Sequence, residues 1–166
     1  MSGRVVAIFI AAAAGEPMQA RTAARAVPGR GLEGDRYFSG VGAFSDDAHP
    51  GREVTELTLI EEEVIEHLQH DLGLSVSAPD SRRNIVTRFV ALNKLVGVDF
   101  SAGAVLLRGT GLCEPCVSLV KSPENKHLLR GLVHKGGLRA QILNEGVITI
   151  GDEAGARAER RFAAVG

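Results

Sequence analysis

The sequence lacks several features that would point to particular partners. It has no tryptophan and a single tyrosine, Tyr37, so it offers no set of aromatic side chains on which nucleic acid bases could stack. Its formal net charge is −1, which gives no overall electrostatic reason to bind nucleic acid or a membrane surface. No stretch is long and apolar enough to cross a bilayer. We therefore expect neither a nucleic acid nor a membrane partner.

Cysteine is also scarce. The two cysteines, Cys113 and Cys116, are three positions apart, and one such pair does not form the disulfide framework of a secreted protein. In a reducing compartment this spacing more often indicates metal or redox chemistry, so we expect a cytoplasmic protein. The apolar stretch after Arg4 loosely resembles a secretory signal peptide. Its β-branched and aromatic residues favour a first core strand over Val5–Ile10 instead.

The chain is long enough to build a core of its own. Its 166 residues predict a single domain that buries about 70% of its unfolded surface. Twenty glycines and six prolines indicate many turns. Short apolar runs, among them 104–107, 140–143 and 147–150, outnumber helical patterns. This pattern predicts a mostly-β (α+β) fold, a barrel or a sandwich, with a few short helices.

One helix is expected near the middle of the chain. Thr58 and Glu61 have the spacing of a capping box. Apolar residues then recur every fourth position from Ile60 to Leu72, which gives a helix one apolar face. Gly73 is the predicted end of this helix.

Two short segments carry candidate ligand-binding residues. Residues 29–36 match G-x-G-x-x-G, but the preceding Pro28 and the following glycine-rich loop exclude the strand and helix of a dinucleotide site. What is left is a tight bend with Asp35 and Arg36, or a solvated turn. Arg82 and Asn84 are two positions apart at a short predicted strand, so both would point to one side of it. This pair suits an anionic or heterocyclic ligand, or else belongs to a charged edge strand.

The cysteine pair follows a predicted strand and two glycines, Gly109 and Gly111, which predict a bend. Side chains at such a sheet rim often carry out chemistry. A structural zinc site would need four ligands, and the histidines at 127 and 134 miss the usual spacing. A thioredoxin-like dithiol would need a long helix after the pair, and Pro123 comes too early for one. Inert buried thiols remain a further alternative.

Taken together, the motifs resemble those of the MOSC domain, named for the C-terminal domain of molybdenum cofactor sulfurases. The resemblance covers about residues 4–153 and leaves 154–166 as a tail. It rests on motifs in the family's order, namely 31–36 (GLEGDR), 54–63, 82–87 (RRNIVT), Cys113-x-x-Cys116, 136–139 (GGLR) and 151–152 (GD).

The resemblance implies a β-barrel that holds or receives the molybdenum cofactor (molybdopterin). Cys116 corresponds to the working sulfur, as a molybdenum ligand or as the carrier of a persulfide. Arg36 ends the family's G-D-R motif, and Arg82 and Asn84 fall on its R-x-N motif. Arg36, Arg82 and Arg139 are permanently charged partners for the cofactor's phosphate.

Three functions remain open at this point. In the first, the protein binds the cofactor or carries sulfur, and a carrier would have a pyridoxal-phosphate-dependent cysteine desulfurase as its partner. A molybdenum-dependent reductase of N-hydroxylated substrates would need a separate electron donor, a flavoprotein or an iron–sulfur protein. A metal-free dithiol oxidoreductase would use both cysteines.

Overall fold

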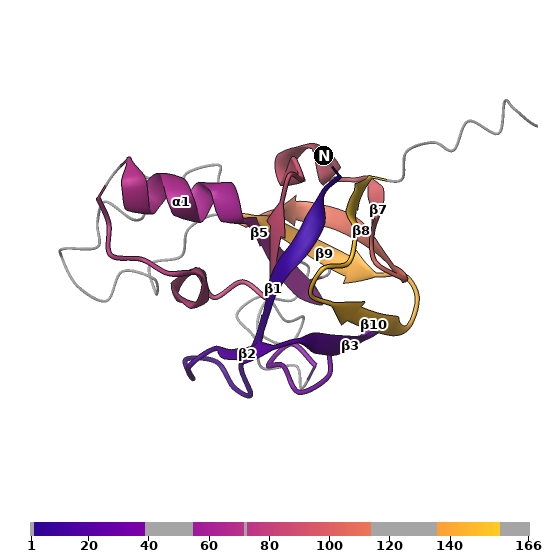
Figure 1. The fold of residues 1–166 in the computed structure, drawn as a ribbon. Coiled ribbons are helices and arrows are strands. Elements are labelled where there is room, and N and C mark those ends of the chain that lie inside the picture. Colours follow the sequence, from indigo (N-terminus) through magenta and orange to yellow (C-terminus); the bar gives the residue numbers. More distant parts are fainter. Residues whose placement is uncertain (1, 39–54, 72, 114–135, 157–166) are drawn as a thin grey trace, which may run out of the picture.

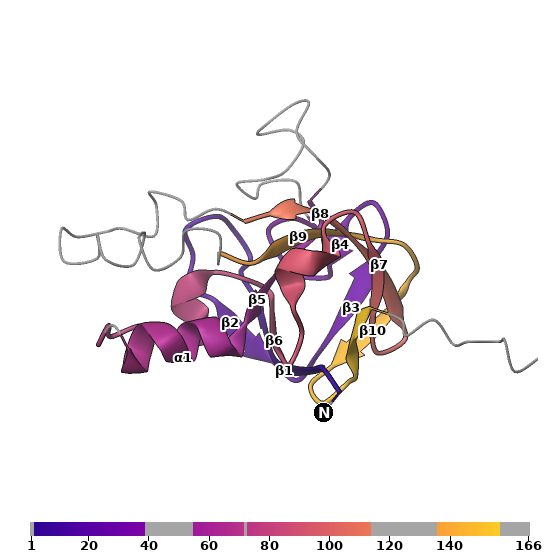
Figure 2. The same ribbon diagram turned by 90° about the horizontal axis from the view of Figure 1, so that it is seen from above.

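A curled β-sheet forms most of the protein in the computed structural model (Figures 1 and 2), which describes residues 2–38, 55–71, 73–113 and 136–156. The strands are β1 (Arg4–Ile10), β2 (Gln19–Arg21), β3 (Ala23–Val27), β4 (Gly31–Leu32), β5 (Leu57–Glu61), β6 (Ile85–Arg88), β7 (Asp99–Ala102), β8 (Val105–Leu112), β9 (Leu138–Ile142), β10 (Gly146–Thr149) and β11 (Ala154–Ala156). The helices are α1 (Glu62–His70) and two 3₁₀ turns, η1 (Ala78–Ser81) and η2 (Leu92–Leu95).

Eight strands form one sheet in the order β11-β7-β8-β9-β5-β6-β1-β2, with β5 and β6 parallel and the other pairs antiparallel. The sheet curls so that β1, next to one end, meets the segment that leads into β11 at the other end. Arg4 in β1 forms a bridge with Glu153, next to β11, and the Val5 amide donates to the Asp152 carbonyl at 2.9 Å. The mostly-β prediction is therefore confirmed, with the sheet curled as in a barrel.

A second, three-stranded sheet continues from the first at a corner. Its order is β10-β3-β4, and only Thr22 separates β2 from β3, so the chain passes from one sheet into the other there. The Ile150 amide donates to the Thr22 carbonyl at 2.9 Å. Figure 1 shows β3 and β10 side by side at the bottom of the molecule.

The core lies inside the curl of the sheet. Alternate residues of β8 and β9 face inward, including the fully buried Leu107 and Leu138. Burying one such side chain contributes about 1.5–3 kcal/mol. A smaller apolar cluster lies on the outside, where Val64, Ile65 and Leu68 of α1 pack against Val86 of β6. None of the helices in the described ranges has the length and hydrophobicity needed to span a membrane.

The predicted start of the helix is wrong. Residues 57–61 form β5, and α1 begins only at Glu62, with no side-chain cap at Glu61. Thr58 is fully buried between β6 and β9, so its neighbours in the sheet outweigh the local capping pattern. The predicted end is closer, since Gly73 has a φ of +63° just beyond the helix, and the Leu74 amide donates back to the Leu68 carbonyl.

The predicted glycine bend before the cysteines is also wrong, because Gly109 and Gly111 both lie within β8. At Gly109 the chain passes directly against η2. A Cβ there would lie 2.0 Å from the Leu95 carbonyl oxygen, and Gly109 pairs with Val96 and with Val98. Glycine is needed at this position for close approach of two backbones.

Other strand predictions hold, with shifted boundaries. The Val5–Ile10 segment is the core strand β1, and the runs near 140 and 147 are β9 and β10. The first three residues assigned to the tail, Ala154–Ala156, form β11 and pair with β7. The sheet therefore extends beyond residue 153.

Gly109→Ala tests the contact between β8 and η2. We expect it to lower the free energy of unfolding by at least about 2 kcal/mol, because the added methyl meets backbone that cannot turn away. Gly146→Ala is the control, since its Cβ would meet the Val105 side chain at 3.1 Å, and it should cost less. Urea unfolding of both variants measures the difference, and equal losses would contradict this account of Gly109.

Candidate functional site

Asp35 fixes the chain that leaves β4. Its carboxylate accepts hydrogen bonds from the Ala11 amide at 3.0 Å and from the Tyr37 amide at 3.3 Å. The Arg36 guanidinium donates to the same carboxylate at 3.1 Å. Asp35 is 2% exposed and Arg36 is 4% exposed, so the alternative of a solvated turn is wrong for these two residues, while residues 28–30, 33 and 34 are exposed.

Arg36 connects this turn to the segment before β6. Its Nη2 donates to the Arg82 carbonyl at 2.8 Å, and Nη1 lies 3.7 Å from the Met18 sulfur. Its guanidinium carbon lies 4.7 Å from the centre of the Tyr37 ring. The structure thus brings together two residues, Arg36 and Arg82, that are 46 positions apart in sequence.

Arg82 does not lie in a strand, which corrects the sequence-based prediction. It follows η1 in the left-handed conformation, with φ 59° and ψ 24°. Reciprocal hydrogen bonds between Ser77 and Asp80 cap η1, and the Ser81 hydroxyl donates to the Ala78 carbonyl at 2.7 Å. The edge-strand alternative is wrong as well, because β6 lies between β5 and β1.

The left-handed turn sends two neighbouring arginines to different places. Arg82 Nη1 donates to the Glu16 carbonyl in the β1–β2 loop at 2.8 Å. Arg83 Nε donates to the Gly136 carbonyl at 2.7 Å. We refer to Arg36, Arg82 and Arg83 as the arginine cluster.

Asn84 holds three backbone segments together. Its Oδ1 accepts hydrogen bonds from the Thr58 amide at 3.0 Å and the Thr58 hydroxyl at 3.2 Å. Its Nδ2 donates to the Phe9 carbonyl at 3.1 Å. Asn84 is fully buried, and it and Arg82 do not share one side of a strand as predicted. In this structure its amide fixes β1 and β5 beside the start of β6.

The described chain reaches Cys113 beside this cluster and resumes at Gly136. The Cys113 amide donates to the Gly137 carbonyl at 2.7 Å, so we call Cys113, Gly136 and Gly137 the neck. Gly137 has a φ of +105°, and a Cβ on it would lie 1.9 Å from the Leu59 carbonyl oxygen. Only glycine fits there. Cys113 is fully buried, as the inert-thiol alternative expects for this one sulfur.

The electrostatics around the neck reflect burial and crowded positive charge. Burial lowers the pKa of Arg82, and the neighbouring Arg36 lowers it further. Burial raises the pKa of Tyr37, while Arg36 lowers it and Cys113 raises it. Arg83 and Asp35 also act on the Tyr37 pKa, so all these groups lie within electrostatic range of one phenol.

The structure says less about the two remaining predicted site residues, Arg139 and Cys116. Arg139 is half-buried in β9, opposite Thr58 and Gly111, two positions beyond the neck. Cys116 lies outside the described residues. Sequence reasoning missed Arg83 and Tyr37 as site residues. The RRN run and the single tyrosine stand out in the sequence, but only the fold shows that both are buried beside the neck.

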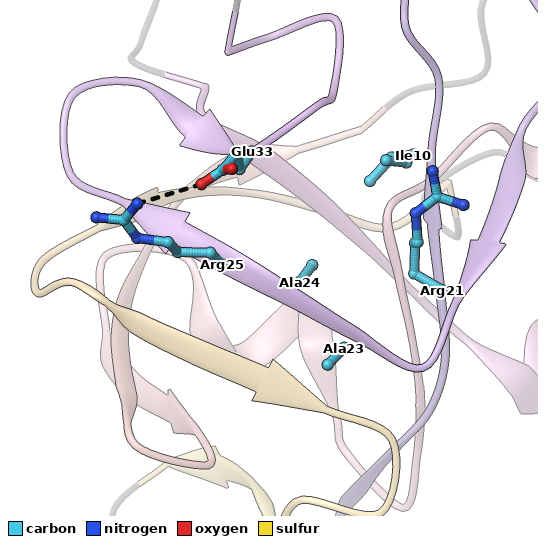
Figure 3. Close-up of a pocket in the computed structure, with 6 residues that line it drawn as sticks. All are labelled: Ile10, Arg21, Ala23, Ala24, Arg25 and Glu33. Carbon is cyan, nitrogen blue, oxygen red and sulfur yellow. Dashed lines mark hydrogen bonds and ion pairs between the residues drawn. The ribbon is translucent and has the colours of Figure 1, made fainter.

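A separate hollow of about 360 Å³ lies over β3 and contains none of the predicted site residues. In Figure 3, Ala23 and Ala24 form its floor, Arg21 stands on one side, and Arg25 pairs with Glu33 on the other. Within the described ranges, no group of three or more histidine, cysteine, aspartate or glutamate side chains could hold a metal ion.

Comparison with known proteins gives a family match and several similar folds. The family model described as "MOSC domain" matches residues 46–154. The solved YuaD protein of Bacillus subtilis is 17% identical, with a TM-score of 0.75 over 93% of this chain and 94% of that one. YiiM of Geobacillus stearothermophilus is 15% identical, with a TM-score of 0.65 over 92% of this chain and 73% of that one. YiiM of Escherichia coli is 16% identical, with a TM-score of 0.64 over 95% and 71%. No curated protein matches the sequence.

Asn84→Ala tests the structural role of the Asn84 amide. We expect the free energy of unfolding to fall by about 3 kcal/mol, because buried backbone groups of Thr58 and Phe9 lose their partners. Asn93→Ala, at an exposed position of η2, should cost much less. Urea unfolding measures both variants, and similar losses would contradict the assigned role.

The Tyr37 titration can be followed alone, because the chain has one tyrosine and no tryptophan. The ultraviolet absorbance of tyrosinate should appear at a pH above the ordinary pKa of 10.0, since burial disfavours the charged phenolate. Above that pH the unfolded chain releases a proton that the folded chain keeps, so this group makes stability fall as pH rises. If the titration midpoint of Tyr37 in the folded protein is at or below its midpoint in the urea-unfolded chain, the burial of this phenol is contradicted.

Proposed function

The chain belongs to the MOSC domain family, and we propose that it binds the molybdenum cofactor at the arginine cluster, with Cys116 as the sulfur that binds the metal. The observation that carries the proposal is the excess of positive charge beside the neck. Three arginines gather there, and the buried carboxylate among them, Asp35, bonds to Arg36. An anionic ligand would balance that excess.

The polar atoms of the cluster fit a phosphate group. Nη2 of Arg82 is buried and has no hydrogen-bond partner among the residues that the structure describes, although a buried donor normally has one. A planar guanidinium donates two parallel bonds to a phosphate. Arg82 would therefore hold the cofactor's phosphate, and Arg36 would add charge while fixing the Arg82 backbone through its carbonyl.

The placement of Cys113 favours Cys116 as the working sulfur. Cys113 is fully buried, and a buried thiol is a poor nucleophile and a poorly accessible ligand. Cys116 follows Cys113 by three peptide units, which span at most about 11 Å, and it is therefore the sulfur that the proposal assigns to the metal. A thiolate is a soft ligand that suits a thiophilic metal. Cys116 would thus bind the metal while the arginines hold the anionic part of the cofactor.

The chain's own residues bind and orient in this proposal. When bound, the cofactor would supply a metal centre capable of two-electron chemistry. Asn84 and Asp35 would keep the arginines in place, and the positive charge would favour the thiolate form of Cys116. Turnover of an N-hydroxylated substrate would require a separate flavoprotein or iron–sulfur protein as electron donor. Arg139 would reach the same ligand from β9.

Metal analysis of protein purified without oxygen, from cells that make the cofactor, tests the proposal. We expect about one molybdenum per chain in the wild type, a loss of at least about tenfold in Cys116→Ser, and near wild-type content in Cys113→Ser. The two serine variants are matched controls for each other.

The other outcomes assign a different role to the sulfur. Molybdenum absent from the wild type, together with a persulfide mass on Cys116, would replace the proposal by a sulfur carrier served by a cysteine desulfurase. If protein without metal has dithiol oxidoreductase activity, and Cys113→Ser and Cys116→Ser lose it equally, a dithiol cycle is indicated. Either result contradicts cofactor binding through Cys116.

A further inference from the structure

The function proposed above gives Arg83 only a share in the positive charge of the arginine cluster, and it gives Tyr37 no role. We propose that they form a second oxyanion subsite, distinct from the one at Arg82. It would accept a carboxylate or a phosphate group and hold it beside Gly136 and Gly137. This inference rests on the proposed function only in placing the ligand at the same arginine cluster.

Arg83 is a buried cation that uses only one of its guanidinium donors in the described part of the chain. It is 5% exposed, and its Nε donates to the Gly136 carbonyl. Its two terminal amino groups make no hydrogen bond within the described part of the chain, and neither is among the fully buried polar atoms without a partner, so a ligand can still reach them. Burying a guanidinium costs several kcal/mol unless an anion and further hydrogen bonds offset the lost hydration. The unused edge of Arg83 therefore points to an anionic partner.

In the described part of the chain, the two buried carboxylates are those of Asp35 and Glu56, and both bond to other groups. Asp35 accepts from Arg36 and from two backbone amides. Glu56 accepts from the Gly29 and Ile142 amides, which ties the β3–β4 turn to β9. Among the described residues, Arg83 forms no ion pair with either. The charge of Arg83 is thus left for a ligand.

Tyr37 supplies a second donor near Arg83. Tyr37 is buried, and its hydroxyl has no hydrogen-bond partner within the ranges that the structure describes. Its ring lies 4.7 Å from the Arg36 guanidinium, which bonds to the Arg82 carbonyl next to Arg83. Burial raises the Tyr37 pKa. The phenol therefore keeps its proton at neutral pH and can donate it to an anion.

The left-handed turn at Arg82 separates the two subsites. Arg82 reaches the β1–β2 loop through the Glu16 carbonyl, while Arg83 reaches the neck through the Gly136 carbonyl. An anion at Arg82 would lie beside Gly15 and Glu16, and an anion at Arg83 beside Gly137 and Cys113. The two sites can therefore be distinguished by the backbone amides whose resonances shift when an anion binds.

The test is a titration of ¹⁵N-labelled, cofactor-free full chain, with inorganic phosphate in one series and acetate in another, at constant ionic strength. We expect the Gly137 and Cys113 amide resonances to shift with saturation. Tyr37→Phe, which removes only the hydroxyl, should weaken that binding about fivefold, and Arg83→Lys should weaken it at least about tenfold. Arg82→Gln should leave the neck response in place.

Arg108→Lys is the matched control, because Arg108 is an exposed arginine paired with Asp99, and it should bind like the wild type. A neck response to phosphate alone identifies a phosphate group as the partner, and a response to acetate identifies a carboxylate. Either one supports the subsite.

Three results would overturn the proposal. These are no saturable shift in the wild type, shifts confined to Gly15 and Glu16, or equal affinity of the neck response in wild type and Tyr37→Phe. Because Arg83→Lys also gives up the bond to Gly136, Tyr37→Phe is the decisive variant. The titration uses no molybdenum, so its outcome does not depend on whether the protein binds the molybdenum cofactor.

Discussion

The side-chain amide of Asn84 is the contact on which the site depends. It uses both its oxygen and its nitrogen to join the backbone of β1 at Phe9 to that of β5 at Thr58. Because it is fully buried, no water can substitute for these bonds, and losing them leaves polar groups unpaired. The two residues just before it, Arg82 and Arg83, are positioned by this anchor on one side and by the capped η1 turn on the other.

The Asn84 amide holds the positively charged arginine cluster in place. Arg36 pairs with the buried carboxylate of Asp35, and burial, followed by the charge of Arg36, lowers the pKa of Arg82. Repulsion within such a cluster destabilises the free protein. A bound anion would offset part of this destabilisation, since a ligand stabilises the state that binds it. The same cluster lies beside the neck, which contains Cys113, the first cysteine of the C-x-x-C motif, and the proposed function needs an anion site there.

The sequence predicted the features that depend on local patterns. Strand β1, the helix end near Gly73 and strands β9 and β10 follow from alternation and turn residues. It failed where distant neighbours decide. Residues 58–61 match a capping box, but β6, β9 and Asn84 hold Thr58 in a strand. Gly109 looks like a bend residue, and only the approach of η2 explains it. Arg36 and Arg82 were singled out from their local motifs, and the family resemblance gave them a role. Arg83 and Tyr37 could not be singled out in this way, because their burial beside the neck is a property of the fold.

The central claim is that the arginine cluster and Cys116 hold one anionic, metal-containing ligand. A crystal structure of the protein from cofactor-producing cells, with anomalous scattering recorded at the molybdenum edge, tests it most directly. The account predicts a molybdenum peak at bonding distance from the Cys116 sulfur and an anionic group in contact with the Arg82 guanidinium. A molybdenum peak away from Cys116, or a cofactor whose anionic groups contact none of the three arginines, would contradict it.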